Sequence, residues 1–306
     1  MTFLWMIMIL SLFCGLTVAS PVILILTMEV TLFTFLFMMY SYKLLNYGST
    51  CLKYFVVQSM ASLMMLVSCA FNMVYCGGMT VWLVFMMLTG LYLKLGVFPM
   101  HFWVISVTEE LPYLMLGTLG IPMKILPLNF LWAFLLTSVG VEYWTYVCMG
   151  AIGSMVIGLI LGLSMLSIRG VLGASSITHS GWFLLALLSM DIIKYFLLYS
   201  MMLSILLWSL NYLNSILVSL SLYGLSGLPP FSIFFGKVLV LSNCFLFQMP
   251  LVYVVVALFT SIFSLFYYLK YSFRFYMINY KTSIFTMSFA FIFMVNVLSS
   301  FLLFLL

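Results

Sequence analysis

The sequence predicts an all-α polytopic membrane protein, a bundle of about eleven transmembrane helices that forms one transmembrane domain over residues 1–306. Hydrophobic residues make up 67% of the chain and charged residues only 5%, whereas a soluble domain carries about 25% charged residues. The apolar residues come in continuous runs long enough to cross a bilayer, not in the alternating ten-residue segments of a membrane β-barrel. Together these observations exclude a soluble domain and a disordered chain.

The apolar runs follow one another along the whole chain, and the linkers between them are short. We expect transmembrane segments at residues 2–19, 21–40, 52–74, 80–103, 112–137, 143–166, 171–190, 195–217, 222–246, 250–270 and 283–305. In the sixth run, small residues recur every four positions, which predicts a ridge that lets a neighbouring backbone approach closely. These residues are Gly150, Ser154, Gly158 and Gly162.

The charges in the linkers predict how the chain is inserted. Eleven spans place the termini on opposite sides, and the Lys and Arg residues gather on the N-terminal side. That side has Lys43, Lys53, Arg169, Lys270, Arg274 and Lys281, against Lys194 on the other. The positive-inside rule therefore places the N-terminus on the cytoplasm-equivalent side. The net charge of +5 includes no dense basic face, which argues against a nucleic-acid partner.

Four charged residues lie deep within the predicted spans: Glu29, Lys94, Lys124 and Lys237. A charge at the centre of a membrane helix costs about 2.5–3.5 kcal/mol on the insertion scale, so these side chains should face the bundle interior. A static ion pair between helices is one interpretation, but one acid cannot neutralise three lysines. Because the charge of a buried lysine depends on its burial and on nearby carboxylates, a row of such residues can pass protons.

Helix-breaking residues accompany each of the three lysines, at Gly96 and Pro99, at Pro122 and Pro127, and at Pro230. Broken helices are tolerated at membrane depth where they line a polar cavity, and transporters build ion sites there. An ordinary kink is the alternative. His179 lies half-way along the run 171–190 among serines and a threonine. Imidazole exchanges protons near neutral pH, so His179 is a candidate relay as well as a candidate packing residue.

The sequence lacks the motifs of cofactor and metal sites. It contains no phosphate-binding loop, dinucleotide fingerprint or nucleophile elbow. The six cysteines form no C-x-x-C pair, and zinc and iron–sulfur spacings are absent. We therefore expect no cofactor and no metal on this chain.

Several segments, in the same order from about residue 25 to residue 270, carry a family resemblance. Residues 94–103, K-L-G-V-F-P-M-H-F-W, and residues 175–182, S-S-I-T-H-S-G-W, are two of them. Others are K-Y-F with Gln58, G-L-P-P-F at 227–231 with Lys237, the acid at Glu29 and the lysine at Lys124. Together they resemble the subunit 2 family of NADH dehydrogenase (ubiquinone), the mitochondrially encoded antiporter-like membrane subunits of respiratory complex I.

The resemblance implies an antiporter-like fold of eleven helices and a role for each buried polar residue. It implies that the chain couples NADH:ubiquinone electron transfer elsewhere in the complex to proton pumping, as a subunit of proton-translocating NADH:ubiquinone oxidoreductase. Glu29 and Lys94 would form the electrostatic pair that switches the channel. Lys124 would be the central relay, His179 would extend the central axis, and Lys237 would be the terminal exchange site.

The resemblance also implies location and partners. The chain would lie in the mitochondrial inner membrane, with its N-terminus in the matrix and its C-terminus in the intermembrane space. NADH, FMN, iron–sulfur clusters and ubiquinone would bind other subunits, and the neighbours would be antiporter-like subunit 4, the small core membrane subunits and lipids such as cardiolipin. Two alternatives stay open: a structural or assembly subunit without its own proton path, and a stand-alone cation/proton antiporter.

Overall fold

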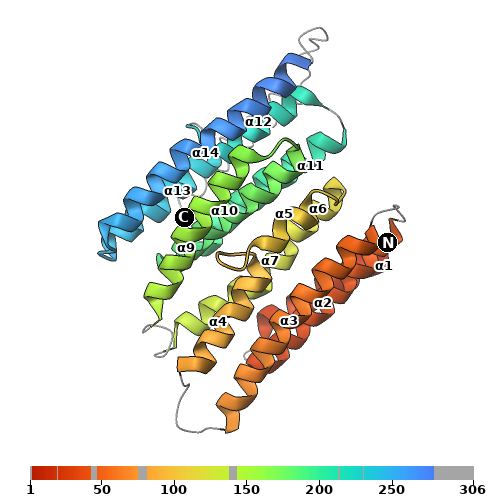
Figure 1. Cartoon of the computed structure of the whole chain (residues 1–306), viewed down its shortest axis with the longest axis vertical. Helices are drawn as coiled ribbons and strands as arrows, with labels where there is room; N and C mark the ends of the chain where they lie inside the picture. Colours follow the sequence, from red (N-terminus) through yellow and green to blue (C-terminus); the bar gives the residue numbers. More distant parts are fainter. Residues whose placement is uncertain are drawn as a thin grey trace. The chain divides into compact units, whose positions relative to one another are not determined.

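The computed structural model describes residues 2–18, 20–42, 47–74, 81–137, 143–212, 214–229 and 231–278. Within these ranges all regular elements are α-helices, which confirms the predicted fold class (Figure 1). The helices are α1 (Thr2–Thr17), α2 (Pro21–Ser41), α3 (Tyr47–Val74), α4 (Val81–Leu95), α5 (Phe102–Thr108), α6 (Tyr113–Gly120), α7 (Pro122–Leu135), α9 (Trp144–Ser164), α10 (Ile168–Leu188), α11 (Ile192–Asn211), α12 (Ser215–Ser226), α13 (Ser232–Leu246) and α14 (Leu251–Ile278).

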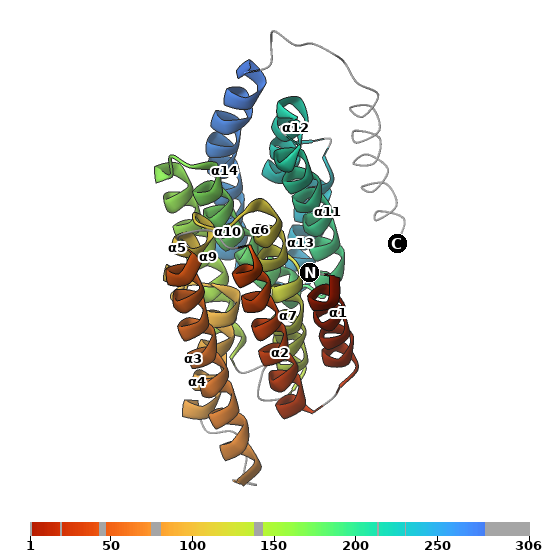
Figure 2. The ribbon, with the colours of Figure 1, turned by 90° about the vertical axis from the view of Figure 1, so that its right-hand side faces the viewer.

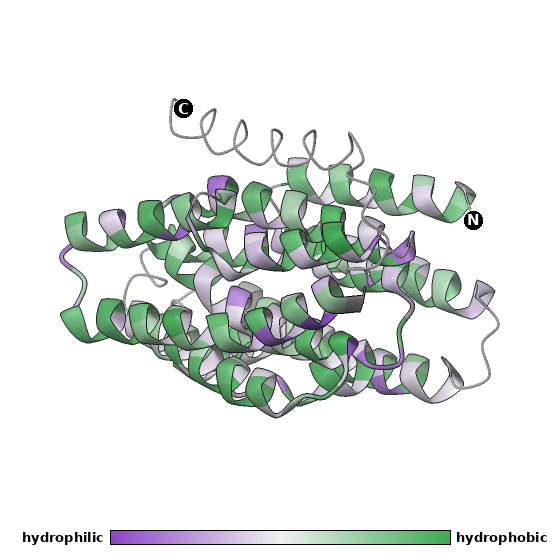
Figure 3. Ribbon diagram, turned by 90° about the horizontal axis from the view of Figure 1, so that it is seen from above, coloured by the Kyte–Doolittle hydropathy of each residue, from purple (hydrophilic) through white to green (hydrophobic). Residues whose placement is uncertain are grey.

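The helices have the length and composition of membrane spans. In the described part of the chain, seven apolar segments are long enough to cross a bilayer: α2, α3, α6 with α7, α9, α10, α11 and α14. Helices α1, α4, α12 and α13 are shorter and also apolar. Green, the colour of hydrophobic residues, is far more common than purple on the ribbons in Figure 3. With α12 and α13 taken as one broken span, these helices account for ten predicted runs, and the run 283–305 lies outside the described residues.

Several predicted boundaries differ from the observed ones. The run 195–217 corresponds to α11, which ends earlier, at Asn211. The run 222–246 corresponds to two helices, α12 and α13, of which α12 begins at Ser215 and ends at Ser226. Helix α14 continues to Ile278, so Lys270 and Arg274 lie within a helix, not in a linker. Continuous apolar composition hides a tight turn between two helices, and a helix can extend past the apolar part of its sequence.

The chain forms two compact units, one within residues 1–154 and the other within residues 155–306. The assignment of a single domain to residues 1–306 stays a prediction. In the first unit, α7 packs against α1, α2 and α4, while α3 packs against α2, α4 and α5. In the second unit, α11 packs against α10, α12 and α13, and α12 packs along α14.

Helix α10 is enclosed by protein. All of its residues from Gly170 to Leu188 are buried within the protein. By comparison, only 28% of the residues in the most apolar part of α14 are buried. The predicted small-residue ridge contributes to this enclosure. At Gly158 a Cβ atom would lie 2.8 Å from the backbone nitrogen of Thr178 and 3.0 Å from the backbone oxygen of Ala174. Glycine at this position therefore lets α9 approach the backbone of α10.

Candidate functional site

Glu29 and Lys94 form an ion pair in the first unit, between α2 and α4. The Nζ atom of Lys94 donates to Oε1 of Glu29 at 3.1 Å. The Lys94 side chain is 3% exposed and that of Glu29 is 20% exposed. A charge-assisted hydrogen bond of this kind is strong because little water competes for either group. The two residues that the resemblance pairs therefore lie within hydrogen-bonding distance of each other.

The end of α4 positions Lys94. Gly96 has φ of +69°, a conformation that favours glycine, and the N–H groups of Gly96 and Val97 both donate to the carbonyl oxygen of Tyr92. The indole Nε1 of Trp103 donates to the carbonyl oxygen of Leu93 at 2.9 Å. Lys94 consequently lies in the last turn of a capped helix, where the helix dipole favours a positive charge.

Lys124 lies at the break between α6 and α7, also in the first unit. Helix α6 ends at Gly120 and α7 begins at Pro122, and the two helices follow each other along one direction (Figure 2). Proline lacks an N–H group and is preorganised for the first position of a helix, which explains a new start here. Lys124 is the third residue of α7 and is 4% exposed. The helix dipole disfavours a cation in the first turn of a helix, so its effect on Lys124 is opposite to its effect on Lys94.

The break between α12 and α13 positions Lys237 in the second unit. Helix α12 ends at Ser226 and Gly227 has φ of +80°. The Nζ atom of Lys237 donates to the carbonyl oxygen of Ser226 at 3.0 Å and lies 5.5 Å from the centroid of the Trp182 ring. The last carbonyl groups of a helix are its negative end, so the break supplies the acceptor that a continuous helix would not offer. Pro230 lies outside the described residues.

His179 lies in the middle of α10 and is 2% exposed. Its Nδ1 atom is 3.0 Å from the hydroxyl oxygen of Tyr195, and its Nε2 atom is 3.4 Å from that of Tyr268. The ring also packs on Tyr199, with 4.7 Å between centroids. Sequence reasoning did not select these tyrosines. The four-residue spacing of Tyr195 and Tyr199, which puts both on one helix face, is the signal that points to them.

The structure thus places the five predicted residues in two groups. Glu29, Lys94 and Lys124 belong to the first unit, while His179 and Lys237 belong to the second. Taken as whole residues, the three lysines are 4–7% exposed, so the prediction that they are buried is confirmed. In the second unit, Trp182 follows His179 by three residues on α10, and the ammonium group of Lys237 lies near the Trp182 ring. Lys237 is therefore close to the turn of α10 that contains the imidazole.

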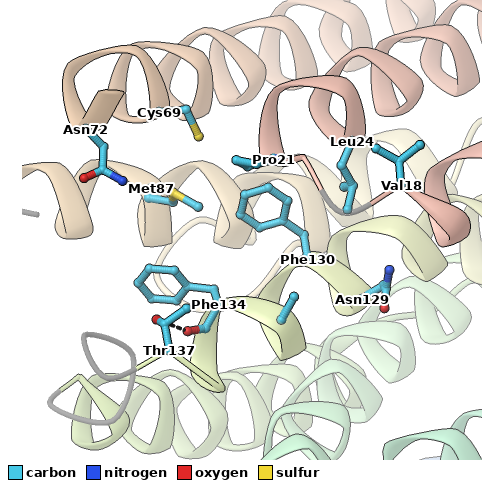
Figure 4. A pocket seen from close by; sticks show the side chains of 11 residues that line it. Val18, Pro21, Leu24, Cys69, Asn72, Met87, Asn129, Phe130, Phe134 and Thr137 are labelled. Carbon is cyan, nitrogen blue, oxygen red and sulfur yellow. Dashed lines mark hydrogen bonds between the residues drawn. The ribbon is translucent and has the colours of Figure 1, made fainter. Parts of the chain in front are cut away.

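A cavity of about 300 Å³ lies in the first unit but contains none of these five residues (Figure 4). Its walls come from α2, α3, α4 and α7 and from Val18 at the end of α1. Most of the lining is apolar, and the polar side chains among it include Asn72 and Asn129. The buried charges therefore lie in the packed interior of the helices, apart from this cavity.

Two further polar contacts involve residues that lie outside the proposed path. The Nζ atom of Lys53, within α3, is 3.8 Å from Oε1 of Glu110, which follows α5. In the second unit the amide of Asn243 donates to the carboxylate of Asp191. The insertion direction of the chain stays a prediction.

The sequence of this chain is similar to a known protein family and to individual members of it. Residues 19–214 match a family model described as the transmembrane part of NADH:quinone oxidoreductase and Mrp antiporters. NADH-ubiquinone oxidoreductase chain 2 of Albinaria caerulea is 35% identical over 264 residues, which are 86% of this chain and 85% of the relative. Its counterpart from Anopheles gambiae is 32% identical over 284 residues, covering 83% of this chain and 79% of the relative.

Solved structures share the architecture at lower identity. A chain of respiratory complex I from Thermus thermophilus, solved with bound aureothin, superposes with a TM-score of 0.76 at 21% identity and covers 88% of this chain and 69% of that one. A chain of the Mrp complex from Dietzia sp. DQ12-45-1b also gives 0.76, at 17% identity, with 86% and 59% covered. These likenesses confirm the predicted antiporter-like fold.

Proposed function

Because this chain belongs to the NADH-ubiquinone oxidoreductase chain 2 family, we propose that it is a proton-translocating, antiporter-like membrane subunit of respiratory complex I. In this role it couples electron transfer from NADH to ubiquinone, carried out on other subunits, to proton movement through its own buried residues. One observation carries the proposal: three lysines buried inside apolar helices, of which Lys94 pairs with Glu29 at 3.1 Å.

The ion pair of the first unit is the switch in this mechanism. The carboxylate of Glu29 stabilises the ammonium form of Lys94 because the two charges are close and poorly hydrated. If the charge of Glu29 is neutralised or drawn away, this stabilisation is lost and Lys94 passes its proton on. Lys124 is the proposed acceptor, and its place in the first turn of α7 keeps the cost of its positive charge high, so it holds a proton only transiently.

The second unit supplies the later part of the proposed path. Lys237 can hold a proton because the carbonyl group of Ser226 and the ring of Trp182 stabilise its charge. We assign Lys237 the role of terminal exchange site and His179 that of a relay in the central axis. Neither role requires a metal or a nucleotide on this chain.

The setting of the subunit is part of the same proposal. NADH, FMN, iron–sulfur clusters and ubiquinone bind other subunits of NADH:ubiquinone oxidoreductase. The neighbours of this chain are antiporter-like subunit 4, the small core membrane subunits and lipids such as cardiolipin. The membrane is the mitochondrial inner membrane, with the N-terminus in the matrix and the C-terminus in the intermembrane space, as the distribution of Lys and Arg between linkers supports.

The test is the substitution Lys124→Met in the assembled complex reconstituted into vesicles. Methionine is unbranched and only one atom shorter than lysine, and it removes the exchangeable proton. We expect quinone reduction with a lowered number of protons pumped per quinone. Lys194→Met, which removes a lysine from the first turn of α11 outside the proposed path, is the control and should leave this ratio unchanged.

The same measurements separate the two alternative functions. Poor assembly of Lys124→Met with a normal pumping ratio per assembled complex would assign the chain a structural role. Cation or proton transport by the purified chain alone in vesicles would indicate a stand-alone antiporter. Full pumping by a normally assembled Lys124→Met complex would refute the proposed relay.

A further inference from the structure

The imidazole of His179 lies between two tyrosine hydroxyls that come from different helices of the second unit. Tyr195 belongs to α11, and its oxygen is 3.0 Å from Nδ1. Tyr268 belongs to α14, and its oxygen is 3.4 Å from Nε2. Both ring nitrogens of one histidine on α10 therefore face a group that can either donate or accept a proton.

The surroundings of this histidine are buried and rich in aromatic rings. Tyr195 and Tyr268 are each 1% exposed, and His179 is 2% exposed. The imidazole packs against the ring of Tyr199 at a tilt of 46°. Phe183 packs edge-on against both Tyr195 and Tyr199, with 5.6 and 5.2 Å between centroids. Such packing holds the imidazole in one orientation, so each nitrogen keeps its own hydroxyl partner.

The hydrogen-bonding capacity of the three groups gives the hydrogen bonds between them a direction. A neutral imidazole carries one N–H donor and one bare nitrogen that accepts. One tyrosine must therefore donate to the ring while the other accepts from it. Moving the hydrogen to the other nitrogen reverses both roles, and because hydroxyl groups rotate, both arrangements are satisfied.

We propose that Tyr195, His179 and Tyr268 form a relay that carries a proton between α11 and α14, an inference that rests on the proposed function. In one transfer the O–H bond of Tyr195 breaks as an Nδ1–H bond forms, and the Nε2–H bond breaks as an O–H bond forms on Tyr268. A protonated lysine or water replaces the hydrogen of Tyr195, and the original hydroxyl proton of Tyr268 leaves to water. One proton crosses, and no group of the relay is left charged.

The packing gives this relay a second property. After one transfer the imidazole carries its hydrogen on Nδ1, so a further proton passes in the same direction only after a rearrangement restores a hydrogen to Nε2. The tilted contact with the ring of Tyr199 holds the imidazole in place between transfers. The relay therefore passes one proton for each rearrangement of its surroundings, and unlike a continuous chain of waters it does not conduct between them.

The test uses Tyr195→Phe and Tyr268→Phe in the assembled complex, each of which removes one oxygen and keeps the ring. Tyr199→Phe is the matched control, because the substitution keeps the aromatic ring that packs against the imidazole. We expect both relay variants to lower the protons pumped per quinone to the level of Lys124→Met, while the rate of quinone reduction and the amount of complex stay normal. Tyr199→Phe should pump like the unmodified complex.

Each outcome decides between the relay and the proposed function. A normal pumping ratio in Tyr195→Phe and Tyr268→Phe, with a lowered ratio in Lys124→Met, would overturn the relay and leave the proposed function standing. A normal ratio in all three would contradict the proposed function itself. If both relay variants fail to assemble while Tyr199→Phe assembles, the hydroxyl groups are structural and the relay is overturned.

Discussion

Replacement of Gly227 by alanine tests the link between a helix break and the position of Lys237. Gly227 follows the last residue of α12 with φ of +80°. An added Cβ would lie 3.0 Å from Nζ of Lys237 and 3.3 Å from its Cδ and Cε atoms. The methyl group therefore strains the backbone and also occupies the place where the ammonium group reaches the carbonyl oxygen of Ser226.

The free-energy cost of the backbone strain and that of the lost hydrogen bond can each be given a magnitude. A non-glycine residue in the left-handed region costs about 1–2 kcal/mol, and a hydrogen bond to a charged group contributes about 1.5–3 kcal/mol. We expect Gly227→Ala to destabilise the second unit by about 3 kcal/mol if Lys237 loses its acceptor, and to lower the pumping ratio. Gly227→Asn separates the two effects, because asparagine tolerates the left-handed conformation better but still places a Cβ against Lys237.

The assay compares thermal stability of the assembled complex and protons pumped per quinone. Gly48→Ala is the control, since a Cβ there meets no atom within 4 Å. Gly227→Ala should lose stability and pumping, whereas Gly227→Asn should recover part of the stability and remain impaired in pumping. If Gly227→Ala matches Gly48→Ala in both measurements, the bond between Lys237 and Ser226 has no role and the reasoning fails.

Two more predictions follow from the geometry of the described helices. In a double-mutant cycle, Glu29→Gln and Lys94→Met should show a coupling of at least about 1 kcal/mol in stability, as contacting charges do. We expect this because the two side chains are only 20% and 3% exposed. Purely additive effects on stability would contradict the ion pair. Gly158→Ala should lower the stability by about 1–3 kcal/mol through overpacking, because the added Cβ would lie 2.8 Å from the backbone of α10. A melting temperature equal to that of Gly48→Ala would show instead that α9 can move away from α10.

The buried charges could be identified from the sequence because each is costly. A lysine inside an apolar run must be enclosed by protein, and Lys94, Lys124 and Lys237 are all 4–7% exposed. The helix breaks could be identified because glycine and proline change the backbone directly. Gly227 shows this: its left-handed conformation ends α12 where the sequence contains G-L-P-P.

The partners of these residues could not be identified in the same way. Tyr195 and Tyr268 impose no cost that marks them, because tyrosine occurs both in cores and at membrane interfaces. Their contact with His179 depends on how α11 and α14 pack around α10. The carbonyl group of Ser226 is a backbone atom that any residue would provide, so its role as acceptor for Lys237 appears only in three dimensions.

The enclosure of α10 has a consequence for how the protein is made. Its residues from Gly170 to Leu188 are covered by protein on every side, and they include His179 and several hydroxyl-bearing residues. A newly synthesised helix of this kind gains little from lipid, where its polar groups would lack the partners that neighbouring helices provide. Insertion of α10 into the bilayer therefore depends on the helices that surround it, so the second unit should leave the insertion machinery as a group of helices instead of one at a time.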